Sequence, residues 1–460
     1  MNQDARAKSV LAGTRPGRIA RWGLASIATL GIFSGAANAA DAPASGWDFE
    51  ASTRVRYEAY DGGYRPGGRE SEDAVSIRTS LGVTYDGDGF GAGLEIRDSR
   101  AYSIDETTPL GSGDIDALEV AQAWVAADVA EGARLTAGRF LLNIGSKRLA
   151  GDPAYRNAAN AFTGLRFDWQ GQGDSPTALT AFFTLPDDRL PNDKPALARN
   201  KFKFDRERWD LRFWGAHVAR KIGTIDGELY VIGLDENDYP GKATRNRHLV
   251  TVGSRLRRSF KSGISAELEG MVQRGNIRES KAADAPEVPV RAWSMHADLA
   301  YRLGGSLKPR ITVFGDIASG DKAGTRKYER FDSLYGPRRG DWGPTSLFGP
   351  LGRSNIKGAG IRFDIAPSKR FDVFGEWRRV GLVSASDAFS FTRVIDPEGN
   401  SGRDGGSQFQ ARARYWLVPK RMQLETGAAY LDKGRFLKTA PNAPRTGDTK
   451  YGYASALYTF

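Results

Sequence analysis

The sequence contains no cysteine, and only three of its 460 residues are histidine. The first absence excludes disulfide bonds and thiolate metal sites. Beyond residue 40, no stretch approaches the ~18 consecutive apolar residues that a transmembrane helix needs. With a mean hydropathy of −0.46, the chain is too polar to be a bundle of membrane helices. Aromatic residues make up 11% of the chain, which is too high a share for a disordered protein.

The N-terminal segment has the features of a secretory signal peptide. Five basic residues between Arg6 and Arg21 precede the apolar stretch 22–40, which ends in the small-residue pattern Ala37-Asn38-Ala39. We expect residues 1–40 to be cleaved and residues 41–460 to form one domain; the alternative, an uncleaved anchor, would be short for a membrane span. Cleavage removes five positive charges and one negative charge from a net +11, leaving +7. An exported chain of this charge is expected to meet anionic lipid or an acidic substrate, and not nucleic acid.

From Trp47 onward, apolar and polar residues alternate, which is typical of β-strands with two unlike faces. In "FEASTRVRYEAY", for example, Phe49, Val55 and Tyr57 share one face, whereas Arg54 and Arg56 lie on the other. The alternation predicts eighteen strands, which begin near residues 47, 73, 89, 116, 133, 161, 176, 209, 226, 247, 262, 291, 308, 355, 370, 407, 420 and 449.

The connections between these strands alternate in length. Short turns are expected at 86–89 and 366–369, and long polar loops are expected at 99–115, 140–160, 185–208, 275–290, 318–354 and 381–406. An even number of strands joined in this way predicts an all-β fold, a transmembrane antiparallel β-barrel of the outer membrane. A soluble β-sandwich is the alternative, but eighteen strands are many for it.

The C-terminal sequence "YGYASALYTF" also fits a barrel. Its apolar residues alternate up to Phe460, so the last strand is expected to pair with the first and leave no free edge. Tyr458 and Phe460 would then lie in the aromatic girdle at the membrane interface.

If the apolar faces contact lipid, the charged faces line the lumen. Acidic residues share these faces and will neutralise part of the charge, but arginine is in excess, and its planar guanidinium group suits two-point contacts with carboxylates. The residues expected to line the pore or bind substrate are Arg54, Arg56, Arg78, Arg97, Arg139, Lys147, Arg148, Arg156, Arg166, Arg338, Arg339, Arg353, Arg362, Arg378, Arg412 and Arg414.

One segment, "GRFLLNIGSKRLAGDPAYRNAANAFTGLRFDW" at 138–169, resembles the alginate-export family of outer-membrane barrels. The similar elements are Gly138-Arg139, Gly145-Ser146 with Arg148-Leu149, Arg156-Asn157, and Phe162 with Gly164 and Arg166. Tyr155 stands where familiar members have tryptophan. The resemblance implies an eighteen-stranded barrel with an arginine-rich constriction that passes a polyuronate from the periplasm to the outside.

The sequence leaves two channel functions open. The first is export of an acidic polysaccharide, and the second is uptake of small organic acids or oligouronates by an anion-selective porin. The expected partners are the substrate, outer-membrane lipid, the barrel-assembly machinery and periplasmic export components.

An enzyme or an adhesin on a barrel is a third possibility, from a different class. Ser294, His296 and Asp298 alternate on one strand face, but successive residues on such a face lie roughly 6–7 Å apart, too far for a catalytic triad. No catalytic or phosphate-binding motif is present, so no enzymatic activity and no cofactor are predicted. The loop "DIASGDKAG" with Asp316 and Asp321 suggests calcium only weakly, and no metal site is predicted.

Overall fold

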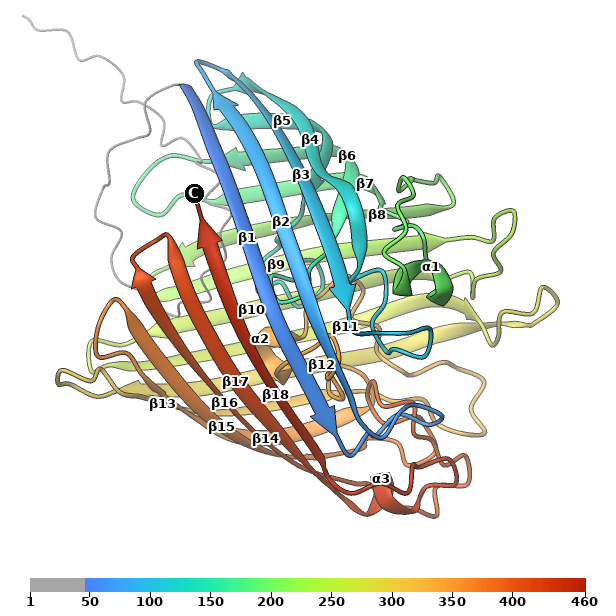
Figure 1. Ribbon diagram of the computed structural model, residues 1–460. Coiled ribbons are helices and arrows are strands. Elements are labelled where there is room, and N and C mark those ends of the chain that lie inside the picture. The colour runs from blue at the N-terminus through green and yellow to red at the C-terminus, as the bar shows by residue number, and fades with distance from the viewer. Residues whose placement is uncertain (1–45) are drawn as a thin grey trace, which may run out of the picture. The chain divides into compact units, whose positions relative to one another are not determined.

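The computed structural model describes residues 46–460, which form one closed barrel of eighteen antiparallel strands (Figure 1). The predicted signal peptide lies outside the described residues. The strands are β1 (Gly46–Asp61), β2 (Glu72–Asp86), β3 (Phe90–Tyr102), β4 (Asp116–Ala130), β5 (Ala133–Leu141), β6 (Ala161–Gln170), β7 (Ala178–Pro186), β8 (Leu211–Ile222), β9 (Ile225–Glu236), β10 (His248–Ser259), β11 (Ile264–Arg278), β12 (Glu287–Arg302), β13 (Arg310–Ala318), β14 (Ile356–Ile365), β15 (Phe371–Gly381), β16 (Asp404–Val418), β17 (Met422–Lys433) and β18 (Thr449–Thr459). Three short helices lie in the loops: α1 (Lys194–Ala198), α2 (Arg339–Trp342) and α3 (Arg435–Thr439).

The predicted strands are confirmed. Every one of the eighteen is present, and each begins within four residues of its expected position. Each strand pairs with its neighbours in sequence, and β18 pairs with β1 from Ser52↔Thr459 to Asp61↔Lys450 (Figure 1). The backbone N–H of Phe460 donates to Ala51 O at 2.9 Å, so the pairing extends to the last residue. Closure leaves no strand edge exposed.

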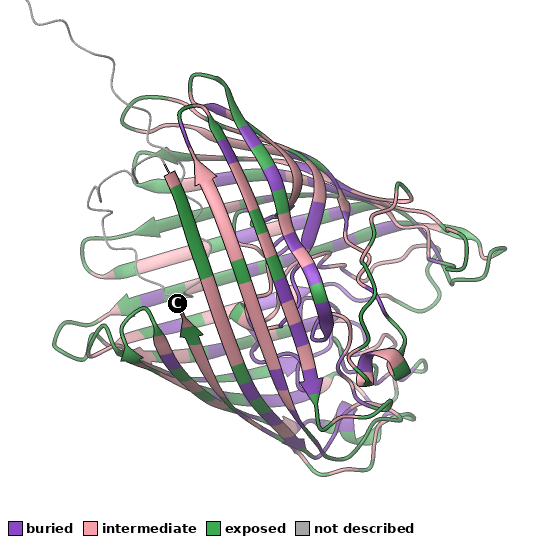
Figure 2. Ribbon diagram, turned by 45° about the horizontal axis from the view of Figure 1, so that its top comes forward, coloured by how far each residue is buried: buried purple, intermediate pink, exposed green. Residues whose placement is uncertain are grey.

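The two faces of the wall differ as the alternation predicts. On the strands nearest the viewer in Figure 2, exposed bands alternate with intermediate and buried ones. The outward face of β1 carries Trp47 and Phe49, which are 66% and 73% exposed, whereas Arg56 and Glu58 on the inward face are buried. An apolar outer face and a charged inner face are the arrangement of a barrel in lipid. No helix among residues 46–460 is long and apolar enough to cross a membrane.

A bulge interrupts the alternation along β4. Relative to β3, the register shifts between Glu95 and Ile96, where Ala121 is an extra residue on β4. Such a bulge changes which face the following residues occupy. Leu118 and Val125 are therefore both about half exposed, although they are seven residues apart and would lie on opposite faces of a regular strand.

The loops follow the predicted alternation of lengths, with four differences. The loop expected at 275–290 spans only 279–286, because β11 and β12 extend further than the alternation indicates. Long connections at 62–71, 237–247 and 434–448 were not predicted. The buried Lys433 ties the first of these to the last, because its Nζ donates to Gly62 O and Gly63 O at 3.0 Å and to Thr446 Oγ1 at 2.7 Å.

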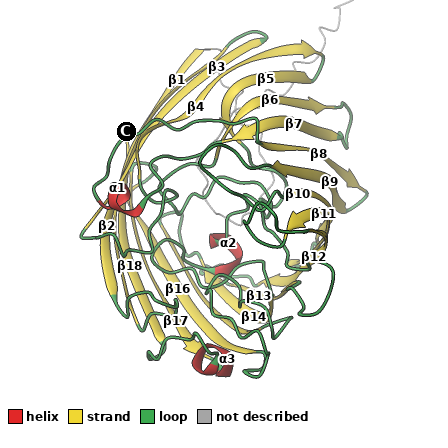
Figure 3. Cartoon of the chain, turned by 90° about the vertical axis from the view of Figure 1, so that its right-hand side faces the viewer, coloured by secondary structure: helices red, strands yellow, loops and turns green. Residues whose placement is uncertain are grey.

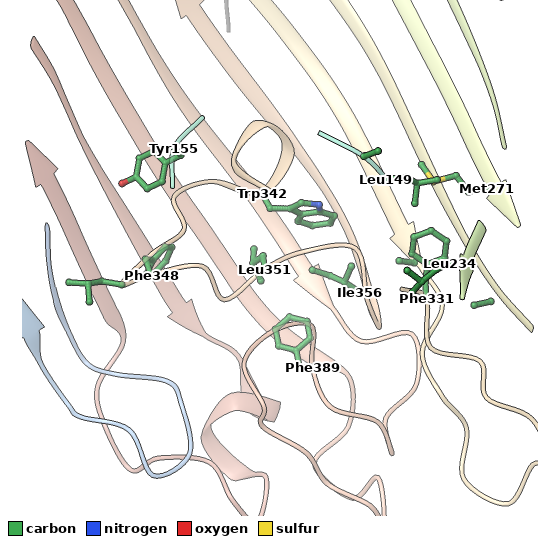
Figure 4. Packing of buried hydrophobic residues seen from close by; sticks show 14 of the residues in the cluster. Leu149, Tyr155, Leu234, Met271, Phe331, Trp342, Phe348, Leu351, Ile356 and Phe389 are labelled. Carbon is green, nitrogen blue, oxygen red and sulfur yellow. The ribbon is translucent and has the colours of Figure 1, made fainter. Parts of the chain in front are cut away.

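The buried apolar cluster lies largely inside the barrel. The end view in Figure 3 shows loops crossing the interior, with α2 near the middle. Figure 4 shows the cluster from close by, including Trp342, Phe348, Leu351 and Phe389, all of them buried. The interior of this barrel is therefore a packed assembly of loops rather than an open tube.

The centre of the Phe460 ring lies 4.6 Å from the centre of the Tyr458 ring. The backbone N–H of Phe460 forms the last hydrogen bond to β1. We expect deletion of Phe460 to lower the amount of assembled barrel several-fold, because the closing strand loses both a hydrogen bond and an interfacial ring. The measurement is the heat-modifiable band of outer-membrane fractions on gels. Wild-type amounts of that band in the truncated protein would show that the C-terminal residue does not contribute to assembly.

Candidate functional site: the arginine-lined lumen

Two long loops fold into the lumen and contact each other there. They are the β5–β6 loop (142–160) and the β13–β14 loop (319–355), which contains α2 (Figure 3). Tyr335 N donates to Leu149 O at 3.0 Å, and the Tyr335 ring packs edge-on against Phe162 at 5.1 Å. These contacts bring loop arginines close to wall arginines that are far away in the sequence.

Arg54 on β1 holds the β5–β6 loop by its main chain. Its guanidinium nitrogens donate to the carbonyl oxygens of Ala154, Tyr155 and Arg156 at 2.8–2.9 Å and to Asn157 Oδ1 at 2.7 Å. Arg54 points into the lumen because side chains alternate along a strand, and the even-numbered residues of β1 face inward. All of these partners are uncharged, so none of them balances the positive charge of Arg54.

Tyr155 lies between two arginines from different elements. The guanidinium carbon of Arg56 is 4.1 Å from the centre of its ring, and that of Arg339 is 4.6 Å from it. The Tyr155 hydroxyl lies 2.6 Å from the Tyr451 hydroxyl, which donates to Glu58 Oε1 at 2.6 Å. Both arginines also have a carboxylate nearby: Arg56 Nε lies 3.0 Å from Glu58 Oε2, and Arg339 Nη2 lies 3.8 Å from Glu425 Oε1. The cation–π contacts add to these ion pairs.

Four of the predicted arginines have no carboxylate partner within 4.0 Å among residues 46–460: Arg54, Arg78, Arg156 and Arg338. Arg338 instead donates to Gly349 O at 2.9 Å and Leu351 O at 3.2 Å. Burial, and next to it the positive charge of Arg156, lowers the pKa of Arg338. With Arg56 and Arg339, these residues form the lumen cationic cluster, which has fewer carboxylates than arginines.

A second group of predicted residues is neutralised. Arg148 Nη1 pairs with Glu267 at 2.7 Å and also with Glu269, while its Nε pairs with Asp341 at 3.1 Å. Arg353 pairs with the same Asp341. Burial alone would raise the pKa of Asp341, but the guanidinium groups of Arg148 and Arg353 hold it well below its ordinary value. This network fastens the loops to β11; Arg378 joins it by donating to Asp341 O.

The remaining predicted residues are distributed along the wall. Each of the arginines has an acidic partner: Arg97 with Glu95, Arg139 with Glu207, Arg166 with Asp168, Arg362 with Asp364, and Arg412 and Arg414 with the shared Asp372. Lys147 is half-buried in the β5–β6 loop, in a left-handed backbone conformation.

Sequence reasoning missed contributions from the unpredicted loop 62–71. Arg65 in this loop donates to Leu347 O at 2.8 Å and Phe348 O at 2.6 Å, and so holds the β13–β14 loop from the extracellular side. The available signal was the basic character of "YRPGGRE" in a Gly/Pro-rich stretch.

The alternating Ser294, His296 and Asp298 do not form a catalytic triad. The Ser294 hydroxyl donates to Ile317 O at 3.1 Å and not to the imidazole. Both ring nitrogens of His296 face carboxylates, Asp316 at 2.8 Å and Asp298 at 3.3 Å. No imidazole nitrogen is left to accept a proton from the serine.

A family model described as alginate export matches residues 46–449, nearly the whole barrel. The chain belongs to the alginate export family. The family was expected from the motifs at 138–169, and the match confirms it.

Several solved outer-membrane proteins have a similar fold. OpdK of Pseudomonas aeruginosa, in a structure with vanillate, superposes with a TM-score of 0.58 at 14% identity, over 90% of this chain and 98% of that one. OpdQ of the same organism superposes with a TM-score of 0.57 at 12% identity, over 90% of this chain and 98% of that one. OccAB1 of Acinetobacter baumannii superposes with a TM-score of 0.56 at 13% identity, over 90% of this chain and 96% of that one. A comparison with curated proteins finds no match.

Family and fold together identify this member of the alginate export family as a channel of the bacterial outer membrane. The family and the fold are both typical of outer-membrane channels and not of enzymes. The arginines of the lumen thus line the interior of a channel that loops 142–160 and 319–355 enter.

Asp341 is the carboxylate that joins the two lumen loops. Replacement by asparagine leaves Arg148 and Arg353 buried with less countercharge, which we expect to destabilise the β13–β14 loop by about 3–5 kcal/mol. The measurement is the rate of trypsin cleavage within 319–355 in detergent-solubilised barrels, which should rise at least tenfold.

The matched control is Asp226→Asn, because Asp226 lies 3.9 Å from Arg257 in a pair that is about half exposed. An exposed pair contributes little, so this variant should be cleaved like the wild type. Equal cleavage of both variants would mean that Asp341 does not hold the loop.

Proposed function

We propose that this channel exports an acidic polysaccharide of the alginate type, a polyuronate, from the periplasm to the cell surface. The observation that carries the proposal is the lumen cationic cluster of Arg54, Arg56, Arg78, Arg156, Arg338 and Arg339, in which arginines outnumber their carboxylate partners. Membership of the alginate export family supports the same substrate class.

The chemistry of this cluster suits a chain that bears one carboxylate per sugar. A guanidinium group can receive a carboxylate in two parallel hydrogen bonds, and several such groups in succession bind the polymer at several points. Each contact competes with existing partners of the arginine, such as the carbonyl oxygens bound to Arg54. Conduction needs binding of this moderate, distributed kind, because a substrate that binds too tightly does not leave.

Transport of a polymer requires space that the loops occupy. The contacts of Arg148 and Arg353 with Asp341 hold loops 142–160 and 319–355 together in the interior. Export is therefore expected to include a shift of these loops. Assembly by the barrel-assembly machinery and delivery of the polymer by periplasmic export components belong to the same proposal.

Uptake of small organic acids is the second candidate. Its support is the lumen filled by loops, because a small anion needs less space than a polymer. The similar barrel OpdK was solved with vanillate, a small aromatic carboxylate. The arginines of the lumen would serve either direction of transport.

Replacement of Arg54 and Arg78 together with glutamine tests the cationic cluster. In planar bilayers the wild-type channel should prefer anions, and the double variant should shift the reversal potential toward that of a cation-selective pore. Oligouronate added on the periplasmic side should block the wild type, with the blocking concentration at least about tenfold higher in the variant, since each bidentate contact is worth roughly 1.5–3 kcal/mol.

The control is Arg257→Gln, the same change of charge at a wall residue that is 46% exposed. Its field is screened within about 8–10 Å at ordinary salt, so it should leave selectivity nearly unchanged. An unchanged reversal potential in the double variant would exclude the cluster as the selectivity site. Block by small organic acids but not by oligouronate would favour uptake over export.

A further inference from the structure

Four carboxyl groups meet near the extracellular ends of β4 and β7, on the wall of the barrel. Asp116 and Glu119 belong to β4, Asp187 directly follows β7, and Asp205 lies in the β7–β8 loop (187–210). All four are almost completely buried: Asp116 and Glu119 are 2% and 3% exposed, and the side chains of Asp187 and Asp205 are 3% and 4% exposed.

Three of these groups use one oxygen in an ordinary contact. Glu119 Oε1 accepts from Ala159 N at 3.1 Å, Asp187 Oδ1 from Arg139 Nη2 at 3.2 Å, and Asp205 Oδ1 from Leu190 N at 2.8 Å. These contacts fix the orientation of each carboxylate. They also tie the group to the β5–β6 loop, to β5 and to the β7–β8 loop.

One oxygen of each of the four groups is left over. Within the described part of the chain, Asp116 Oδ2, Glu119 Oε2, Asp187 Oδ2 and Asp205 Oδ2 are buried and have no hydrogen-bond partner. Buried polar atoms without a partner cost free energy, and native proteins normally satisfy them. One ligand oxygen from each of Asp116, Glu119 and Asp205 lies within 4.8 Å of the others.

The surrounding arginines balance only part of the charge of this group. Arg139 is shared among three carboxylates: it pairs with Asp187 at 3.2 Å, with Glu207 at 2.7 Å and, at 4.0 Å, with Asp205. Arg189 donates to Ala159 O at 2.7 Å and to Asn160 Oδ1 at 3.2 Å, and Arg97 pairs with Glu95 at 2.7 Å.

The remaining negative charge must be balanced by protons or by a cation. Burial, and next to it the charge of Asp205, raises the pKa of Asp187 to about 8. Burial raises the pKa of Asp205 as well.

We propose that Asp116, Glu119 and Asp205 bind a calcium ion, with Asp187 beside them. Calcium takes oxygen ligands at 2.3–2.6 Å, so two ligands on opposite sides of the ion are separated by about 5 Å, which fits the spacing of the oxygens of Asp116, Glu119 and Asp205. Magnesium needs shorter bonds and octahedral geometry, and zinc favours histidine or cysteine, neither of which is in this group. The site would fasten the β7–β8 loop to β4, beside the β5–β6 loop that enters the lumen.

The other cluster of potential ligands lacks these properties. Glu267, His296 and Asp298 also gather closely, but Glu267 pairs with Arg148 and Arg255, and Asp298 pairs with His296. None of the three has a buried atom without a partner. Within residues 46–460, only the group with Asp116, Glu119 and Asp205 combines close spacing with unsatisfied oxygens.

Calcium binding can be measured directly on the full barrel. Protein refolded in detergent without lipopolysaccharide, and freed of metal with a chelator, is titrated with CaCl₂ in a calorimeter. We expect one site with a dissociation constant of about 10⁻⁴–10⁻³ M, and at least tenfold weaker binding of MgCl₂. The variant Asp116→Asn with Asp205→Asn should lose the site.

The control variant is Asp128→Asn, on the same strand, where the carboxylate is 41% exposed and paired with Arg134. It should bind calcium like the wild type. Heat modifiability on gels shows whether each variant has folded. No saturable binding by the wild type up to about 5 mM calcium would overturn the proposal, and so would unchanged binding by the folded double variant.

A second measurement needs only the wild-type protein. The exposed Lys201 and Lys203 of the β7–β8 loop are trypsin sites, and calcium should slow cleavage there at least tenfold relative to chelator. Magnesium at the same concentration should have little effect. Equal cleavage rates with calcium and with chelator would mean that no calcium ion fastens this loop.

Discussion

The hydrogen-bonded pairing of β18 with β1 is the contact on which the rest of the molecule depends. A sheet with free edges would expose unpaired N–H and C=O groups to lipid, where no water can satisfy them. Pairing from Ser52↔Thr459 to Asp61↔Lys450 removes both edges at once. It also separates an apolar exterior from an interior that can hold buried arginines and carboxylates, a composition that no lipid-facing surface tolerates.

Within that interior, arginines have two different uses. Arg148, Arg353 and Arg378 are partners of carboxylates or of the loop backbone and hold loops 142–160 and 319–355 in place. Within residues 46–460, Arg54, Arg78, Arg156 and Arg338 lie without carboxylate partners and leave positive charge in the lumen. One residue type therefore both fastens the loops and supplies the charge of the interior.

The strands could be predicted well because a single rule governs them. Alternating faces determine the wall from Trp47 to Phe460, and the rule weakens at register shifts such as the bulge at Ala121, which changes the parity of β4. It also placed Arg54 and Arg56 correctly on the inward face. The resemblance of residues 138–169 to one family supplied the remaining information, and the family match confirmed it.

The interior could not be predicted in the same way, because its contacts join residues hundreds of positions apart. Nothing local in the sequence indicates that Asp341 would meet Arg148, or that Arg65 would hold the carbonyl oxygen of Leu347. Asp116 and Asp205 come together only through the closed barrel and the path of the β7–β8 loop. Their sequence neighbourhoods contain no ligand spacing that a motif search would detect.

The way Arg54 holds the β5–β6 loop has a consequence for sequence variation. Three of its four acceptors are carbonyl oxygens, which every residue type provides. Side chains at 154 and 156 can therefore be exchanged without releasing the loop, provided that the backbone path is kept. Members of the family that retain the arginine could thus alter the side chains displayed to the transported molecule, and so diversify their cargo, while the same anchor stays in use.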